Sequence, residues 1–273
     1  MSGLVTERSI ASTTQLAPGD LSAADLLAEL TEGRLRAAQP DSSAADGWRV
    51  RQDVKAAILG LFSDRAMTSW SSGPFVFHDR ANLPPMDPGP DRRIVPGGTA
   101  IRAGARLAPG VIVMPPSYVN VGAWVGEGTM VDSHVLVGSC AQIGARVHLA
   151  AGVTIGGVLE PAGARPVIVE DDAFVGAGSR LLEGVLVGRG AVIGAGVVLT
   201  GTSRLYDLVE ERQIDGSVER PLVVPAGAVV VPGARPAAGD WARDRGLTIA
   251  TALIVKRRDP GTDARVALEA ALR

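Results

Sequence analysis

Aliphatic side chains recur at every sixth position through the middle of this sequence. Across residues 101–155, ten consecutive sixth positions are Ile, Leu or Val, and glycine often follows the aliphatic residue. The register resumes across residues 169–205 and again at Val223 and Val229. A helical period of 3.6 does not fit, and neither does the alternation of hairpins, whose turns recur every eight to twelve positions. The pattern therefore predicts short strands separated by tight corners.

Such a repeat is typical of a left-handed parallel β-helix, in which three hexads form one triangular coil of about 18 residues. Two polar or proline-containing segments interrupt the register, Gly157 to Ile168 and Tyr206 to Leu222. Segments that leave one face of a solenoid often carry its function. We expect a mainly β fold with the β-helix over residues 99–235, in which most repeat residues serve only as core and corners.

The N-terminal flank predicts a helical domain. Residues 1–18 have no period and are expected to be disordered, because they are rich in Ser, Thr and Ala. Within residues 19–98, apolar spacing and helix-start signals predict helices at about 20–36 and 50–64. Six prolines in residues 66–98 predict an irregular connector between these helices and the β-helix.

A short C-terminal extension is expected over residues 236–273. The aliphatic segment Leu247 to Val255 predicts a strand, and a short helix is expected near residues 264–272. Between them lies a basic triplet that begins at Lys256. Such a triplet is usually the solvated end of a strand, but Lys256 is also a candidate contact for a nucleotide phosphate, which binds cationic side chains through charge-assisted hydrogen bonds.

Composition and charge narrow the class of protein. A net charge of −2 and a pI near 6.0 give no sign of a nucleic-acid or membrane partner. One cysteine, Cys140, excludes an intramolecular disulfide, and with three histidines the sequence offers no metal cluster. The N-terminus lacks the apolar core of a signal peptide and no run of 18 apolar residues occurs, so a cytoplasmic location is expected.

The segment TMVDSHVLVGSCAQIGARVHLAAGVTIGGVLEP, residues 129–161, is more specific than a generic hexapeptide repeat. Related patterns occur in residues 26–38, 93–128, 224–236 and 252–259. Together these segments resemble the tetrahydrodipicolinate N-succinyltransferase family of hexapeptide-repeat acyltransferases, and the resemblance covers roughly residues 22–272. It implies a homotrimer with active sites in clefts between subunits.

The resemblance also implies a reaction. A succinyl group would move from succinyl-CoA, a co-substrate, to the amine of ring-opened tetrahydrodipicolinate in lysine and diaminopimelate biosynthesis, with no permanent cofactor and no metal. Amine attack on a thioester is helped by a side chain that orients the amine and receives its proton. By its place in the MVD motif, Asp132 is the expected catalytic and substrate-binding carboxylate, although aspartate also favours turns for structural reasons.

Two arginines are expected to bind the acceptor. Arg93 matches a family arginine that pairs with a substrate carboxylate, and the neighbouring Arg92 is an alternative for that role. Arg180 stands where the family commonly has a glutamate near the acceptor amine. Because this exchange reverses the charge, it leaves open an alternative, an acyltransferase of the same fold with another amine or acyl-CoA as substrate. A non-enzymatic scaffold is a third hypothesis, which calorimetry with CoA would test.

CoA is expected to lie along the outside of the coils, near the small residues Gly156, Gly157 and Ala177. Two other reactive side chains are interpreted as structural. His148, in the family's VHL motif, is expected to pack at a coil corner, whereas His134 does not match the residues common at its position. Cys140 is interpreted as a small core residue because its neighbours supply no base to lower the pKa of its thiol.

Overall fold

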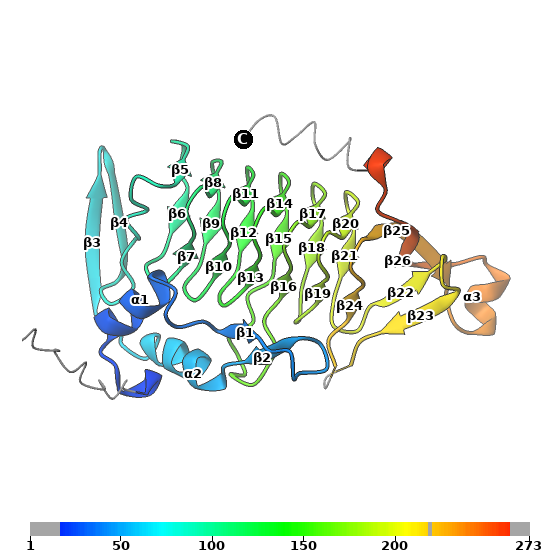
Figure 1. Cartoon of the computed structure of the whole chain (residues 1–273), viewed down its shortest axis with the longest axis horizontal. Helices are drawn as coiled ribbons and strands as arrows, with labels where there is room; N and C mark the ends of the chain where they lie inside the picture. The colour runs from blue at the N-terminus through cyan, green and yellow to red at the C-terminus, as the bar shows by residue number, and fades with distance from the viewer. Residues whose placement is uncertain (1–16, 218–219, 263–273) are drawn as a thin grey trace, which may run out of the picture.

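The computed structural model describes residues 17–217 and 220–262, and a triangular parallel β-helix forms its centre (Figure 1). Each coil pairs with the coil 18 residues later, as Met130 pairs with His148, except where an excursion lengthens the turn. Three parallel sheets form the faces, and we name each by a central strand: the β10, β11 and β12 sheets.

The strands of the three faces are two residues long except at the C-terminal end. The β10 sheet contains β7 (Arg106–Leu107), β10 (Trp124–Val125), β13 (Gln142–Ile143), β16 (Ile168–Val169), β19 (Leu186–Val187) and β24 (Val223–Val224). The β11 sheet contains β5 (Arg93–Ile94), β8 (Ile112–Val113), β11 (Met130–Val131), β14 (His148–Leu149), β17 (Phe174–Val175), β20 (Val192–Ile193), β25 (Ala228–Pro236), β26 (Thr248–Arg257), β22 (Arg204–Asp207) and β23 (Arg212–Asp215). The β12 sheet contains β6 (Ala100–Ile101), β9 (Tyr118–Val119), β12 (Leu136–Val137), β15 (Thr154–Ile155), β18 (Arg180–Leu181) and β21 (Val198–Leu199).

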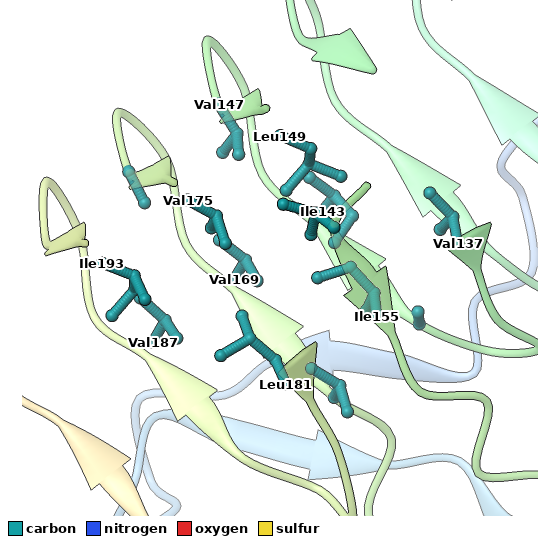
Figure 2. Close-up of a cluster of buried hydrophobic side chains, with 14 of the residues drawn as sticks. Val137, Ile143, Val147, Leu149, Ile155, Val169, Val175, Leu181, Val187 and Ile193 are labelled. Carbon is teal, nitrogen blue, oxygen red and sulfur yellow. The ribbon is translucent and has the colours of Figure 1, made fainter. Parts of the chain in front are cut away.

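One aliphatic residue per strand points into the coil, and these residues stack into ladders that form the core (Figure 2). The expected positions from 107 to 155 and from 169 to 205 are fully buried, which confirms the six-residue register there. The expectation for Val223 and Val229 was wrong by one residue. Val223 pairs with the outward Leu186 and Val224 with the inward Val187, so Val224 and, by the same shift, Val230 face the core. The preceding excursion returns the chain one residue out of phase.

The coils meet at three edges, which we name by a residue on each. The chain passes from the β11 to the β12 sheet at the Asp132 edge, from the β12 to the β10 sheet at the Cys140 edge, and from the β10 to the β11 sheet at the Glu127 edge. Left-handed backbone angles recur at the corners, as at His134 with a φ of 61° and Cys140 with a φ of 64°. Such angles favour glycine, which accounts for the glycines that share these positions.

An N-terminal unit packs along the Cys140 edge. It contains the short helix η1 (Pro18–Asp20), helices α1 (Ala23–Thr31) and α2 (Gln52–Leu61), and the paired strands β1 (Ala38–Pro40) and β2 (Trp48–Val50). Both expected helices are present and shorter than predicted. The Ser22 hydroxyl caps α1 by accepting a hydrogen bond from the Asp25 amide. Leucines of α1 and α2 share a buried cluster with Val121 and Cys140 of the β-helix, which fixes the unit to this edge.

The segment expected to be an irregular connector contains a hairpin instead. Strands β3 (Met67–Ser72) and β4 (Phe75–Arg80) pair in antiparallel register, and Figure 1 shows them at one end of the β-helix. Gly73, with a φ of 57°, and Pro74 form the two-residue turn. Proline at this turn is compatible with pairing on both sides of it, so proline content alone misled the prediction.

The opposite end of the β-helix is extended by β22, β23, β25 and β26, with helix α3 (Asp240–Asp244) between β25 and β26 (Figure 1). The expected C-terminal strand is confirmed as β26, which is antiparallel to β25. The helix expected near residues 264–272 and most of the N-terminal segment expected to be disordered lie outside the described residues. Within the described part of the chain, no helix is long and apolar enough to cross a membrane.

Candidate active site

Asp132 lies at the corner that follows β11, where the backbone holds it firmly. Its amide donates to the Leu149 carbonyl over 2.9 Å, and its own carbonyl accepts a hydrogen bond from the Ser117 hydroxyl over 2.8 Å. One carboxylate oxygen, Oδ1, accepts from the Ser133 amide over 2.6 Å. Across the described residues no hydrogen bond is found to Oδ2. The half-buried carboxylate therefore has a fixed orientation and one oxygen that can serve a ligand.

A hollow of about 360 Å³ opens at the Asp132 edge. Its walls come from three consecutive corners and the strands beside them, and it is lined by Gly98, Ala100, Pro116, Ser117, Tyr118, His134, Val135 and Leu136. The exposed His134 follows Asp132 by two residues in the same corner. Burial raises the pKa of the Tyr118 phenol, which therefore stays protonated and donates to Asn120 Oδ1 over 3.2 Å. The hollow thus offers protein groups beside Asp132 that can surround a small polar ligand.

Arg180 is brought to the same edge by the stacking of the coils. It begins β18 and points outward, two strands beyond Leu136 in the β12 sheet, since Leu136 pairs with Thr154 and Thr154 with Arg180. Two strand spacings separate it from the coil of Asp132 by roughly 10 Å along the axis. Ala177 lies in the corner just before Arg180 and is exposed. The fold therefore places these three predicted site residues on one edge.

Arg93 lies farther away. It begins β5, two strands from Met130 in the β11 sheet, and is exposed near the N-terminal end of the β-helix. Its neighbour Arg92 is half-buried, with Nε donating to the Leu107 carbonyl and Nη1 to the Pro88 carbonyl, each over 2.9 Å. Arg92 is therefore engaged in holding the connector, whereas Arg93 keeps its guanidinium at the surface.

Gly156 and Gly157 lie at the Cys140 edge, at the other end of the β12 sheet from Asp132. A Cβ at Gly157 would lie 2.6 Å from the Ser139 amide nitrogen, and one at Gly156 would lie 3.1 Å from the Leu182 side chain. Glycine is therefore required at position 157 by the packing of one coil on the next. Their assignment as CoA contacts stays a prediction. The presence of glycine at these two positions does not support it, because the packing of the adjacent coils already explains the small residues.

The excursion after Gly157 folds onto helix α2. Lys55 of α2 is fully buried and donates to the Pro161 carbonyl over 3.3 Å and to the Ala164 carbonyl. Arg165 forms an ion pair with Asp46 of the N-terminal unit. Sequence reasoning missed Lys55, because a lysine in a helix is ordinarily exposed and its role depends on a loop more than 100 residues away.

Lys256 lies in β26 opposite Val229 and forms an ion pair with Asp259 over 2.7 Å. The rest of the basic triplet is also engaged: Arg257 pairs with Asp207 over 2.7 Å, and Arg258 donates to two backbone carbonyls. The structure thus favours the solvated end of a strand over a preformed phosphate site. Lys256 as a nucleotide contact stays a prediction.

Cys140 belongs to a buried apolar cluster, as its structural interpretation predicted, whereas His148 is buried on the outer face of the β11 sheet. Cys140 is fully buried, and burial raises the pKa of its thiol to about 12, which excludes it as a nucleophile near neutral pH. His148 is 3% exposed and stacks on Phe174 with ring centroids 5.1 Å apart. It lies in strand β14 and not at a corner, which corrects that detail of the expectation. Among residues 17–217 and 220–262, no group of three or more His, Cys, Asp or Glu side chains is placed to hold a metal ion.

The repeated coils of the fold define the class of protein to which the chain belongs. Residues 166–201 match a family model described as the hexapeptide repeat of succinyl-transferase, and the fold is the left-handed parallel β-helix of hexapeptide-repeat acyltransferases. Full-length relatives narrow the class further. The chain is 41% identical to a 2,3,4,5-tetrahydropyridine-2,6-dicarboxylate N-succinyltransferase of Bordetella petrii, over 95% of this chain and 94% of that protein. It is 43% identical to the protein of the same name from an Azoarcus species, over 92% and 88% of the two chains.

The chain belongs to the 2,3,4,5-tetrahydropyridine-2,6-dicarboxylate N-succinyltransferase family and is an acyltransferase. This confirms the family resemblance found in the sequence. Among solved structures, a Campylobacter jejuni protein described as a putative 2,3,4,5-tetrahydropyridine-2-carboxylate N-succinyltransferase matches with a TM-score of 0.44 and 18% identity, over 85% of this chain and 63% of that one.

Proposed function

We propose that this enzyme transfers the succinyl group of succinyl-CoA to the amine of ring-opened tetrahydrodipicolinate, 2-amino-6-oxopimelate, in lysine and diaminopimelate biosynthesis. The observation that carries the proposal is the match over nearly the whole chain to relatives named for this reaction. The Asp132 edge supports it, because this one edge carries a carboxylate, a hollow on the N-terminal side of it and an outward arginine roughly 10 Å away on the other side.

The chemistry requires few groups. The neutral amine attacks the thioester carbonyl, an N–C bond forms, and the C–S bond breaks as the tetrahedral intermediate collapses. The proton lost by the amine ends on the sulfur of the departing CoA. Asp132 orients the attacking amine, takes up its proton through Oδ2 and passes it to the sulfur. Arg180 binds one acceptor carboxylate, and Arg93, four strand spacings from Arg180 in the same chain, binds the other from a neighbouring subunit. CoA approaches along Ala177, and the donor enters and leaves as a co-substrate.

The test is release of free CoA from succinyl-CoA by the purified protein with freshly prepared tetrahydrodipicolinate, detected with a thiol reagent. Asp132→Asn should lower kcat by about 10²- to 10⁴-fold, because the isosteric amide cannot take up the amine proton. Asp244→Asn in the exposed helix α3 is the matched control and should leave kcat unchanged. Absence of CoA release by the wild-type protein would refute the proposed reaction.

Arg180 favours one further candidate, transfer to another amine. Its guanidinium is exposed at the Asp132 edge, where it attracts a carboxylate and repels an ammonium group. A comparison of several amino dicarboxylates as acceptors, each with succinyl-CoA and acetyl-CoA, distinguishes the two candidates. A higher kcat/KM for an acceptor other than tetrahydrodipicolinate would favour the second, as would failure to complement a diaminopimelate auxotroph.

We also propose that the enzyme is a homotrimer and acts in the cytoplasm. The β3–β4 hairpin supports an assembly, because Phe75, Val76 and Phe77 are 66%, 71% and 54% exposed, and an isolated two-stranded hairpin is marginally stable in water. The use of a single cysteine, which cannot form an intramolecular disulfide, is consistent with the cytoplasm. Light scattering after size exclusion should give three times the mass of the chain, and a monomeric mass would refute the assembly.

A further inference from the structure

A second cavity lies on the other side of the β-helix from the Asp132 edge. It encloses about 520 Å³ between the N-terminal unit and the β10 sheet, and extends to the Glu127 edge. Arg36 and Trp48 form one wall, Arg106 and Trp124 form the floor, and Glu127, Glu170, Asp171 and Arg189 line the edge. We call this cavity the Arg106 pocket. Its volume falls within the range of small-molecule sites, and no group of the proposed reaction lies in it.

Arg36 reaches the pocket between two tryptophans. Its guanidinium carbon lies 4.1 Å from the ring centre of Trp124 and 5.1 Å from that of Trp48. Nε donates to Gln142 Oε1 over 2.5 Å, and no ion pair to Arg36 is found within the described chain. Burial lowers the pKa of Arg36 to about 10, against the opposing effect of Asp171. The aromatic faces hold the cation in place, and its two Nη groups are available to an anion.

Arg106 is the second cation without a carboxylate. Its Nη1 donates to the Thr31 carbonyl over 3.3 Å, and its buried Nε has no hydrogen-bond partner among the described residues. Burial lowers the pKa of Arg106, and the positive charge of Arg92 adds to that effect. The Nε of Arg106 is buried beside Gly33 and cannot be reached from the cavity, so the group that Arg106 can offer a ligand is Nη2, for which no hydrogen bond is found among the described residues.

Two of the three acidic side chains of the pocket already accept hydrogen bonds, and one of these two, Asp171, also forms an ion pair. Glu170 accepts hydrogen bonds from Trp48 Nε1 and from the Arg189 amide, each over 2.9 Å. Asp171 pairs with the Arg189 guanidinium over 2.8 Å and accepts from the Ala145 amide over 2.9 Å.

Glu127 remains. It lies exposed at the rim of the pocket, and in the part of the chain that the structure describes it forms no ion pair. Among the described residues Glu170 also forms no ion pair and keeps its charge, but hydrogen bonds occupy both of its oxygens. The charged groups left to pair with a ligand are therefore those of Arg36, Arg106 and Glu127. A ligand with two anionic groups and one cationic group complements this set.

We propose that the Arg106 pocket is a second ligand site, which binds an amino dicarboxylate. Its carboxylates pair with the guanidinium groups of Arg36 and Arg106, and its ammonium group pairs with Glu127 at the rim. The carbon chain between them lies against Trp124. Because Arg36 belongs to the N-terminal unit and Arg106 to the β-helix, the ligand links the two and stabilises their association. The site is independent of the acceptor site at the Asp132 edge.

Three probes of equal carbon number test the charge pattern by titration calorimetry on the full-length protein. L-2-aminoadipate carries both carboxylates and the amine, adipate lacks the amine, and L-norleucine lacks the second carboxylate. We expect L-2-aminoadipate to bind at least tenfold more tightly than either of the others. Arg106→Gln should weaken its binding at least tenfold, and Glu127→Gln should reduce its affinity to that of adipate.

Because L-2-aminoadipate also resembles the proposed acceptor, the titration is repeated with Asp132→Asn, which removes binding at the Asp132 edge and should leave binding at the Arg106 pocket unchanged. Unfolding curves for each variant establish that it is folded, and Glu127→Gln, a change at an exposed position, decides the matter if Arg106→Gln is not. The proposal is overturned if adipate binds as tightly as L-2-aminoadipate, if Glu127→Gln has no effect, or if Asp132→Asn abolishes the binding. CoA release, measured separately, reports on the proposed reaction alone.

Discussion

Replacement of Cys140 by alanine should make the free energy of unfolding decrease less steeply at alkaline pH. The thiol is fully buried at the Cys140 edge, where burial raises its pKa from 9.0 to about 12 while the nearby Lys55 ammonium opposes the shift. Between about pH 9 and 12 the thiol is ionised in the unfolded protein and still protonated in the folded protein. The folded state therefore binds one more proton, and the free energy of unfolding falls as the pH rises through this range. The slope approaches about 1.4 kcal/mol per pH unit, which amounts to about 2 kcal/mol at pH 10.5.

Urea unfolding at pH 7.5 and 10.5, at one protein concentration, measures this effect as a difference between two chains. Alanine leaves a small cavity at both pH values and lowers the free energy of unfolding equally at both. The informative quantity is therefore how the difference in the free energy of unfolding between wild type and Cys140→Ala changes with pH. Tyr118, whose pKa is raised by burial, contributes to both proteins alike. The pKa of Lys55 is lowered by burial and raised by the charge of Cys140, so part of the measured difference belongs to the Lys55–Cys140 pair. A difference in the free energy of unfolding that is the same at both pH values would refute the raised pKa of Cys140. Rapid reaction of native Cys140 with a thiol reagent at pH 8 would refute it as well.

Arg180→Gln should raise the KM for the acceptor about tenfold with a smaller change in kcat, as expected for loss of one charged hydrogen-bonding group, and steady-state kinetics would measure it. Lys55→Ala should lower the free energy of unfolding by about 2 to 4 kcal/mol in urea titrations, because it leaves a cavity and two unpartnered carbonyls. Gly157→Val should destabilise the fold itself, seen as a lower melting temperature, since its Cβ meets the Ser139 amide. Ala177→Phe should leave the melting temperature unchanged and raise the KM for succinyl-CoA, because this exposed corner has room for a side chain.

The core could be predicted from the sequence because each strand buries one residue and the coils repeat at constant length. The prediction failed where that length changes, since Val224 faces the core in place of Val223 after the second excursion. The hairpin β3–β4 was missed although its signal is present. Two six-residue segments rich in aromatic and hydroxyl residues flank Gly73-Pro74, which is a hairpin pattern.

The candidate site could be predicted only in part. Asp132 and Arg180 were assigned from family motifs. Counting 18 residues per coil places both on one edge if the coil with the first excursion is counted as 26 residues, the separation between the paired residues His148 and Phe174. The Arg106 pocket has no such signal. Arg36 and Trp124 meet because the N-terminal unit docks on the β-helix, and neither a period nor a motif encodes that contact.

The three edges of the β-helix differ in how much protein covers them, and this decides where substrates can reach the coils. The Cys140 edge is closed along Val121 and Cys140 by the N-terminal unit. The Glu127 edge is partly covered and leads into the Arg106 pocket. At the Asp132 edge, every corner from 114 to 197 has an exposed residue, among them His134 and Ala177.

In the proposed reaction the acyl donor and the acceptor meet at Asp132, and both would therefore approach along the Asp132 edge. This favours Ala177 over Gly157 as a contact for CoA, because Gly157 lies at the opposite end of the β12 sheet. The glycine at 157 is already explained by the Ser139 amide of the adjacent coil, whereas nothing lies within 4 Å of a Cβ built at Gly178, beside Ala177. Small residues on a stacked coil thus indicate a ligand only where the neighbouring coil does not itself demand them.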